Sequence, residues 1–322
     1  MKIPGGLKNK NMKSKEIKFA LITDNSSEPS YYCSKNKYFR TSNHEDVTST
    51  DLPYTAFFTY PEIFNGHFIN VNFGLFPDIK FDLIFAAIEK NPNHLDHIKK
   101  LYPDAVVIGM YKEYWNQTPE IRNYIIDNTD AFSFPYFNIN LYKSYNLNIP
   151  KIPLVIPQPL NHLKLQSTFK NKFDLKTDAI FDYNKTSSAG RNSVNNNEIF
   201  SKTPLQRIKY EGPRGLKQFL EAFSHYKYML STDQKEWGGI ISAQSIALKT
   251  ILIGSNTDYQ KVLFPDLVGV DVEYLLQKID KLHTNKKYRD DTINYAYDKL
   301  INTYSFQSIK NKVITLYNDL KK

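Results

Sequence analysis

The sequence predicts an α/β fold built from two successive parallel-sheet domains, and three observations lead to this prediction. Short, continuous apolar runs alternate with amphipathic segments along the chain, as is typical of strands buried on both faces and of the helices that cover them. A proline-rich stretch at residues 149–159 divides the alternation into two series. The 322 residues suffice for two domains of ordinary size.

The first series begins with the apolar run IKFALIT at residues 17–23, which we expect to be a strand. Similar runs predict strands at residues 81–88 and 105–110. Helices are predicted at residues 92–101 and 119–128, because each segment begins with proline, which helices favour in their first turn.

The four prolines of residues 149–159 forbid a helix and disfavour a central strand, so we expect an extended connection there. Residues 164–176 are polar and ambiguous, and residues 187–197 predict a loop rich in glycine and asparagine. The second series predicts strands at residues 178–183, 207–210, 226–231 and 250–253, and helices at residues 215–223, 239–248, 272–282 and 288–303. A last amphipathic helix is expected at residues 305–320.

These patterns predict four parts. A flexible basic tail occupies residues 1–16, and the N-terminal domain occupies residues 17–158. The C-terminal domain occupies residues 159–304, and residues 305–322 form the terminal helix.

Composition excludes several classes of protein. With 41% hydrophobic and 23% charged residues, the chain is not intrinsically disordered. The single cysteine, Cys33, excludes a disulfide framework and a cysteine-based zinc site, and fits a reducing compartment. No apolar run approaches the roughly 18 residues that span a bilayer, and the lysine-rich tail lacks the apolar segment of a secretory signal. We therefore expect a cytoplasmic protein, in a bacterial host if the gene is viral.

The positive charge is unevenly distributed. The net charge is +9, yet residues 1–160 carry 17 basic and 16 acidic side chains, whereas residues 164–227 carry 12 basic and 6 acidic ones. A concentrated positive field favours a polyanionic partner, such as a nucleotide phosphate or a nucleic acid. The alternative is that the lysine content reflects only the composition of a low-GC genome.

Residues 228–255 carry the most informative pattern: a strand, a polar loop, a Gly-Gly pair, a helix and another strand. Glycine at positions 238 and 239 lets backbone amides approach a phosphate, and a helix N-terminus adds a partial positive charge. Glu236 lies just before the helix, and Gln244 lies eight positions later. A carboxylate and an amide facing one space suit a polyhydroxyl ligand. The alternative is an ordinary capped helix.

This pattern resembles the donor-binding motif of retaining glycosyltransferases of the GT-B fold. The residues that carry the resemblance are Ser231, Glu236, Trp237, Gly238, Gly239 and Gln244. It implies a GT-B architecture, with two Rossmann-like domains facing across a cleft and a C-terminal helix that returns to the first domain. It also implies a metal-independent transferase that needs no cofactor and uses a nucleotide-sugar, expected to be UDP-linked, as co-substrate.

The resemblance further implies roles for single residues. Glu236 would lie near the donor sugar, the amides of Gly238 and Gly239 near the diphosphate, and Gln244 at the ribose. This chain departs from the family pattern in having Gln244 instead of a second carboxylate. Lys249 and Ile251 also replace the usual glycine and proline after the helix. The stereochemical outcome, retention or inversion, therefore stays open.

A departing diphosphate also needs cations, which the family usually supplies from the loop after the first strand of the second domain. In that loop, Lys185 and Arg191 are the candidates, and Arg207 and Arg214 are fallbacks. Such cations stabilise the leaving phosphate electrostatically, although each could equally be a solvated surface charge. The chain contains no Asp-x-Asp pair and no His-x-x-x-His spacing, so we expect no catalytic metal.

The first domain offers candidate bases for the acceptor hydroxyl. Asp24, Glu89 and Glu113 each follow a predicted strand, where the carboxyl edge of a parallel sheet would place them near a ligand. The alternative for each is a helix cap or a solvated carboxylate. Residues 24–30 contain no glycine-rich turn, which disfavours a dehydrogenase or an NTPase.

Aromatic and basic side chains alternate near the N-terminus, a combination that can stack on bases and bind phosphates. They are Tyr31, Tyr32, Lys35, Lys37, Tyr38, Phe39 and Arg40. They favour a nucleic acid as acceptor. The chain also resembles, in size and layout, small GT-B enzymes that modify phage DNA, and this resemblance implies double-stranded DNA with a hydroxymethylated base such as 5-hydroxymethylcytosine. The alternatives are a transferase acting on a cell-surface polysaccharide or lipid-linked saccharide, and a non-enzymatic module that binds nucleotides or glycans. No stable membrane insertion is expected.

Overall fold

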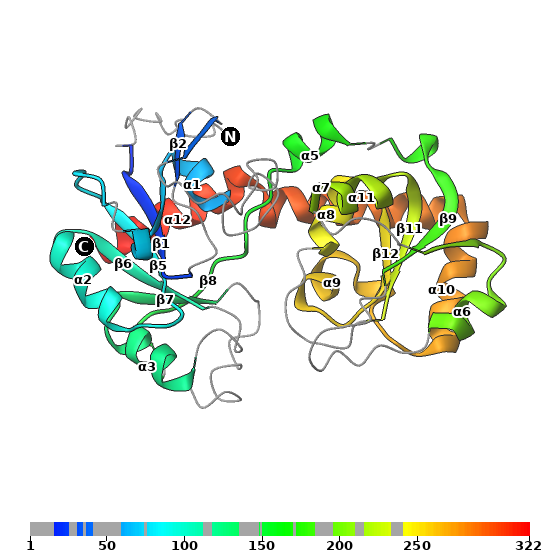
Figure 1. The fold of residues 1–322 in the computed structure, drawn as a ribbon. Helices are drawn as coiled ribbons and strands as arrows, with labels where there is room; N and C mark the ends of the chain where they lie inside the picture. Colours follow the sequence, from blue (N-terminus) through cyan, green and yellow to red (C-terminus); the bar gives the residue numbers. More distant parts are fainter. Residues whose placement is uncertain are drawn as a thin grey trace, which may run out of the picture.

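The computed structural model describes residues 16–25, 31–34, 37–40, 59–73, 76–111, 118–134, 148, 150–169, 172–183, 196–209, 216–232 and 241–322. The described strands form one sheet of eight strands and one of four. Figure 1 shows each sheet in a lobe of its own, with helices packed around it. The α/β fold with two sheets that the sequence predicts is thereby confirmed.

The sheet of the first lobe has the strand order β3-β2-β4-β1-β5-β6-β7-β8. Its strands are β1 (Phe19–Thr23), β2 (Tyr31–Ser34), β3 (Lys37–Arg40), β4 (His67–Asn70), β5 (Leu83–Ala87), β6 (Val106–Met110), β7 (Ala131–Phe134) and β8 (Pro153–Val155). The strands from β4 to β8 in this order are parallel. The sheet is not wholly parallel, however, because β2 runs antiparallel to both β3 and β4.

The predicted strands β1, β5 and β6 are buried on both faces, which explains their continuous apolar sequences. Phe19 and Leu21 of β1 belong to one hydrophobic cluster, and Ala20 and Ile22 belong to another. Three helices of this lobe are α1 (Thr59–Phe64), α2 (Asn93–Leu101) and α3 (Pro119–Asp127). The first cluster includes α1 residues, and the second includes residues of α2 and α3. The predicted helices α2 and α3 are confirmed, whereas α1, β4, β7 and the β2–β3 hairpin were not predicted.

The sheet of the second lobe has the order β10-β9-β11-β12, and all its pairs are parallel. Its strands are β9 (Thr177–Asp182), β10 (Gln206–Lys209), β11 (Tyr226–Ser231) and β12 (Ile251–Gly254). All four were predicted, with ends displaced by one residue at most.

Helices surround this second sheet. They are α5 (His162–Thr168), α6 (Asn196–Lys202), α7 (Leu216–Ser224), α8 (Ile241–Ala247), α9 (Asp258–Leu263), α10 (Val272–Thr284) and α11 (Lys286–Tyr304), with the short helices η3 (Phe173–Leu175) and η4 (Pro265–Leu267). The ambiguous segment 164–176 thus contributes to α5 and η3. The last two residues of the predicted loop 187–197 begin α6, and the rest of that loop lies outside the described residues.

The proline-rich connection joins the lobes by a set of side-chain hydrogen bonds. Thr59 Oγ1 donates to the Pro159 carbonyl at 2.9 Å, and the Tyr60 hydroxyl contacts the carbonyls of Ile156 and Pro157 at 3.2 and 3.1 Å. From the second lobe, the Tyr259 hydroxyl accepts the Gln158 N–H at 3.1 Å. Burial raises the pKa of both tyrosine hydroxyls, so each stays protonated at neutral pH.

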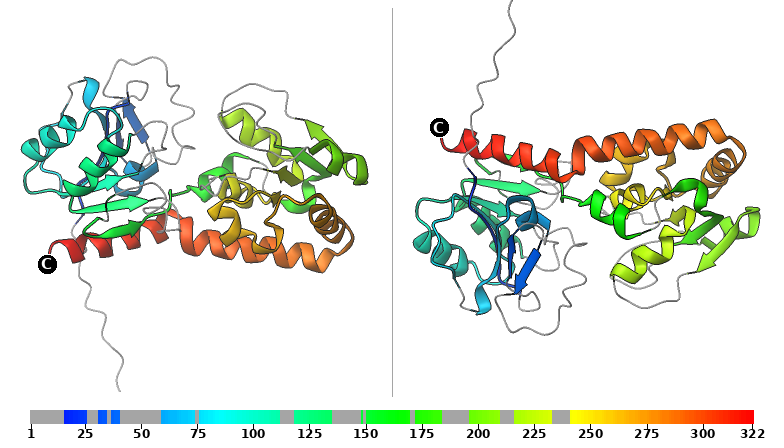
Figure 2. Two further views of the ribbon diagram at one scale, coloured as in Figure 1. Left: turned by 90° about the horizontal axis from the view of Figure 1, so that it is seen from below. Right: turned by 90° about the horizontal axis from the view of Figure 1, so that it is seen from above.

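The chain crosses between the lobes a second time through α12 (Phe306–Leu320). The Leu160 N–H donates to the Tyr304 carbonyl at 2.9 Å, so the two crossings are hydrogen-bonded to each other. Figures 1 and 2 show α11 along the second lobe and α12 along the first, where the C-terminus lies. Ile309 and Val313 are fully buried in the hydrophobic cluster that contains Phe19. The domain boundaries themselves stay a prediction.

We expect Ile309→Ala to destabilise the protein by about 3 kcal/mol, because it removes a fully buried side chain and leaves a cavity. Urea unfolding followed by tryptophan fluorescence and circular dichroism measures the change. Thr315→Ala, at an exposed position of the same helix, should change the free energy of unfolding by less than about 0.5 kcal/mol. Equal effects of the two substitutions would contradict the docking of α12 on the first sheet.

Candidate functional site

The parallel strands of the second sheet end at a common edge, and the predicted donor residues belong to segments that leave this edge. The last residues of β9, β11 and β12 are Asp182, Ser231 and Gly254. Residues 184–195, which include Lys185 and Arg191, follow β9, and residues 233–240, which include Glu236, follow β11. In open α/β sheets, ligands bind at such carboxyl ends.

A buried polar cluster connects the carboxyl end of β9 to the carboxyl end of β11. Asn196 Nδ2 donates to Asp182 Oδ1 at 2.7 Å, and Thr232 Oγ1 donates to Asn196 Oδ1 at 2.8 Å. The exposed fractions of Asp182, Asn196 and Thr232 are 5%, 1% and 2%. The amide of Asn196 therefore bridges the end of β9 and the end of β11, away from water.

Arg207 belongs to the same cluster. Its Nε and Nη2 atoms donate to Asp182 Oδ2 at 2.9 and 2.5 Å, and its Nη1 donates to Asn197 Oδ1 at 2.7 Å. The guanidinium also lies over the Phe200 ring, 4.6 Å from its centroid. These contacts make Arg207 a structural partner of Asp182. They favour Lys185 and Arg191 over Arg207 as phosphate ligands, and these two roles stay predictions.

The structure also describes the predicted residues Ser231 and Gln244. Ser231 is 2% exposed and pairs in register with Gly254. Gly254 has φ +85°, and a Cβ there would lie 2.1 Å from the Ser231 carbonyl oxygen, so glycine is required for this close approach. Gln244 lies in α8 and is 2% exposed. Its role at a ribose stays a prediction.

Several predicted site residues lie outside the described part of the chain. They are Glu113, Lys185, Arg191, Arg214, Glu236, Trp237, Gly238 and Gly239. Lys249, which replaces the usual glycine after the helix, adopts φ +56°. Glycine adopts this left-handed conformation without strain. The backbone conformation therefore explains why the family pattern has glycine at this position.

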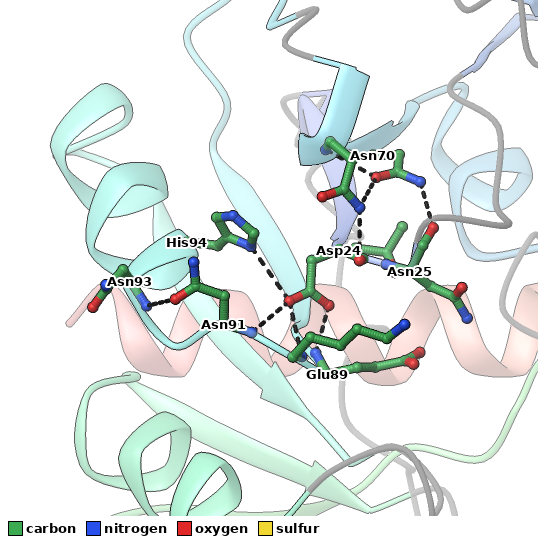
Figure 3. Close-up of polar contacts among 10 residues, drawn as sticks. Asp24, Asn25, Asn70, Glu89, Asn91, Asn93 and His94 are labelled. Carbon is green, nitrogen blue, oxygen red and sulfur yellow. Dashed lines mark hydrogen bonds and ion pairs between the residues drawn. The ribbon is translucent and has the colours of Figure 1, made fainter.

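At the carboxyl edge of the first sheet, Asp24 organises the turn that follows β5 (Figure 3). Its Oδ1 accepts the Glu89 N–H at 2.6 Å, and its Oδ2 accepts the N–H groups of Lys90 and Asn91, both at 2.9 Å. His94 Nδ1 lies 3.3 Å from Oδ2. The Asp24 side chain has no exposed surface, so these contacts favour the capping alternative over a base that takes a proton from an acceptor.

Asparagine side chains complete this edge. Asn70 Oδ1 accepts both the N–H and the side-chain Nδ2–H of Asn72 at 3.0 Å, and Asn72 Nδ2 also donates to the Asp24 carbonyl at 2.7 Å. Glu89, the second described candidate base, is 2% exposed and belongs to the turn that joins β5 to α2. A catalytic role for Glu89 stays a prediction.

Within the described residues, no group of three or more histidine, cysteine, aspartate or glutamate side chains is arranged to hold a metal ion. Among the described helices, none combines the length and the apolar character that crossing a membrane requires.

Sequence reasoning missed Asp182, Asn196 and Thr232 as residues of the candidate site. One signal could have found Asp182, because it ends an apolar strand run (DAIFDY) just as Asp24 follows IKFALIT. Nothing in the sequence distinguishes Asn196 from its neighbours in the run VNNNE, since only the fold brings it between the two strand ends.

No protein family and no curated protein matches the amino-acid sequence. Solved structures match its fold. A sucrose-phosphate synthase from Thermosynechococcus elongatus aligns with a TM-score of 0.59 and 12% identity, over 94% of this chain and 88% of that one. HepE (Alr3699) of Anabaena in complex with UDP aligns with a TM-score of 0.58 and 8% identity, over 94% and 100% of the two chains.

A third similar structure is an alpha-glucosyltransferase in complex with UDP and a DNA 13-mer containing an HMU base. It aligns with a TM-score of 0.51 and 13% identity, over 95% of this chain and 99% of that one. Together with the two sheets and the returning α12, these similarities establish that the chain has the fold of GT-B glycosyltransferases.

We expect Asp24→Ala to lower the free energy of unfolding by about 2–3 kcal/mol, because three backbone N–H groups lose a buried acceptor. Chemical denaturation measures the loss. Asp130→Ala is the matched control, since this exposed carboxylate accepts the Val107 N–H at 2.8 Å, and its loss should be about 1 kcal/mol. An Asp24→Ala protein of unchanged stability would contradict the capping role.

Proposed function

We propose that the protein is a glycosyltransferase that moves a sugar from a UDP-linked donor to the hydroxyl group of a hydroxymethylated base in DNA. The observation that carries the proposal is the two-lobed fold, shared over nearly the whole chain with UDP-bound structures. The segment that resembles a donor-binding motif leaves the carboxyl edge of the second sheet in this fold.

The donor half of the reaction belongs to the second lobe. The bond between the anomeric carbon and the diphosphate oxygen breaks, and UDP leaves with the electron pair. A new bond joins that carbon to the acceptor oxygen, and the proton of the acceptor hydroxyl passes to water. We assign the amides of Gly238 and Gly239 and the cations Lys185 and Arg191 to the departing diphosphate, and Glu236 to the sugar, because preorganised charge stabilises such a leaving group.

The acceptor half is assigned to DNA on two grounds. The similar alpha-glucosyltransferase is bound to DNA that contains an HMU base, and residues 164–227 carry twice as many basic as acidic side chains, 12 against 6. Basic side chains attract the phosphate backbone, and a base within a duplex must be flipped out to reach a transferase site.

We expect UDP to stabilise the protein, by about 2.7 kcal/mol at one hundred times its dissociation constant, and radiolabelled UDP-glucose to be hydrolysed slowly without acceptor. Glu236→Ala and Arg191→Ala should each reduce sugar release at least about 100-fold while the circular dichroism spectrum is unchanged. Lys287→Ala, which removes an exposed partner of Asp291, should release sugar like the unsubstituted protein. UDP binding without sugar release would favour the non-enzymatic alternative, and absence of both would contradict the proposed function.

We expect label from UDP-glucose to enter duplex DNA containing 5-hydroxymethylcytosine, and not the same duplex containing cytosine. Binding to the duplex should weaken by a factor of about 10³ or more between 50 and 200 mM salt, as for proteins that contact several phosphates. If label enters a bacterial polysaccharide or a lipid-linked saccharide and no DNA substrate, the DNA acceptor is wrong and the saccharide alternative holds.

A further inference from the structure

We propose that His94 is the general base that takes the proton from the acceptor hydroxyl, and that Asp24 is the positioning residue that holds its ring. The inference rests on the proposed function, because it names the group that first receives the proton in the acceptor half of that reaction. Both residues belong to the described part of the first lobe, at the carboxyl edge of its sheet. The sequence predicts only carboxylates as bases at this edge.

The topology of the first sheet marks this edge as a place for a ligand. The chain passes from β1 to β4 on one side of β1, and then to β5 on the other side. The helix α1, which precedes β4, and the helix α2, which follows β5, belong to hydrophobic clusters on opposite faces of the sheet. β1 and β5 therefore flank the topological switch point, and in open α/β sheets a ligand binds outside the carboxyl ends of the strands at such a point.

Asp24 and His94 come from the two sides of this switch point (Figure 3). Asp24 directly follows β1, and His94 lies in the first turn of α2, after the turn that leaves β5. The Nδ1 atom of His94 is 3.3 Å from the Oδ2 atom of Asp24. The parallel pairing of β1 with β5 thus brings together two side chains that are 70 positions apart in the sequence.

The two side chains differ in exposure, and this difference assigns their roles. The Asp24 side chain has no exposed surface, whereas 28% of the His94 side chain is exposed. Glu89, in the same turn, is only 2% exposed. A general base must come within hydrogen-bond distance of the hydroxyl group of the bound acceptor. His94 meets this requirement better than either carboxylate.

The contact with Asp24 also decides which nitrogen atom of the His94 ring is available. A carboxylate only accepts hydrogen bonds, so the neutral ring donates its Nδ1–H to Asp24 and keeps the lone pair on Nε2. Within the described residues, the His94 ring makes no other hydrogen bond or ion pair. Three backbone N–H groups hold the Asp24 carboxylate in place. The carboxylate can therefore fix the orientation of the ring, as in other pairs of aspartate and histidine.

The proton transfer accompanies the formation of the new bond. His94 Nε2 takes the proton while an electron pair of the acceptor oxygen forms the bond to the anomeric carbon, and UDP leaves with the electron pair of the broken bond. The Asp24 carboxylate stabilises the imidazolium that forms beside it. The imidazolium then gives the proton to water, which restores the neutral ring.

The test measures the transfer of label from UDP-glucose to duplex DNA containing 5-hydroxymethylcytosine. It compares the full chain with its variants His94→Ala, His94→Gln and His97→Ala. Glutamine can keep a hydrogen bond to Asp24 but has no basic nitrogen. His97→Ala is the matched control, because His97 is exposed three positions later on the same helix, where its ring contacts Phe76.

We expect both His94 variants to lower kcat for transfer at least about 100-fold, and to leave the dissociation constant for UDP unchanged in isothermal titration calorimetry. Added imidazole should restore part of the activity of His94→Ala, because the space of the missing ring admits the free base, but not that of His94→Gln. His97→Ala should transfer label like the unsubstituted protein.

The positioning role of Asp24 has a readout of its own. Asp24→Asn, assayed at a temperature where the variant is folded, should lower kcat at least about tenfold. It should have no further effect in a protein that already carries His94→Gln, because residues that act as a unit have non-additive effects. An equal loss in both backgrounds would show that Asp24 only stabilises the fold, and would contradict its positioning role.

Three results would overturn the role of His94, and they are distinguishable. If the unsubstituted protein transfers label and the His94 variants transfer it equally fast, His94 is not the base and the proposed function stands. If the His94 variants lose UDP binding or the folded structure together with transfer, the histidine is structural. If the unsubstituted protein transfers no label to this duplex, the proposed function fails, and the role of His94 fails with it.

Discussion

The arrangement of the two lobes depends on the hydrogen bonds that satisfy the proline-rich crossing. Four prolines deprive residues 149–159 of N–H groups that a longer strand would need, and the buried carbonyl groups still require donors. Thr59 and Tyr60 of α1 supply them from the first lobe. Tyr259 supplies an acceptor from the second lobe. The Leu160 N–H also donates to the Tyr304 carbonyl, so the two crossings of the chain contact each other. After this contact, α12 packs on the first sheet.

Both lobes have an aspartate at the carboxyl end of a strand, but the two aspartates have different hydrogen-bond partners. In each, an aspartate stands at the carboxyl end of an apolar strand: Asp24 after β1 and Asp182 at the end of β9. Asp24 receives three backbone N–H groups from one turn and so stabilises a single loop. Asp182 receives side chains from two other elements, Arg207 and Asn196. Asp24 therefore stabilises one turn of the chain, whereas Asp182 connects the end of β9 to both α6 and β10.

Several of the correctly predicted strands are buried on both faces. β1, β5 and β6 are continuous apolar runs because hydrophobic clusters lie on both sides of the sheet. Prediction failed for β4 and for α1, which have only four and six residues. Both elements are stabilised by tertiary contacts that the local sequence does not show. At the candidate site, the sequence does not show that Arg207, which has the chemistry of a phosphate ligand, pairs with Asp182.

The sequence by itself determined the α/β class and the strands of the second sheet, because apolar runs and helix starts are local properties of the chain. Only the tertiary structure decided that the first sheet has an antiparallel hairpin, that Asp24 caps a turn and that Asn196 links two strand ends. The physical reason is that a hydrogen bond between residues distant in the chain depends on which strands become neighbours. That pairing is set by the packing of both lobes as a whole and leaves no periodic trace in the sequence.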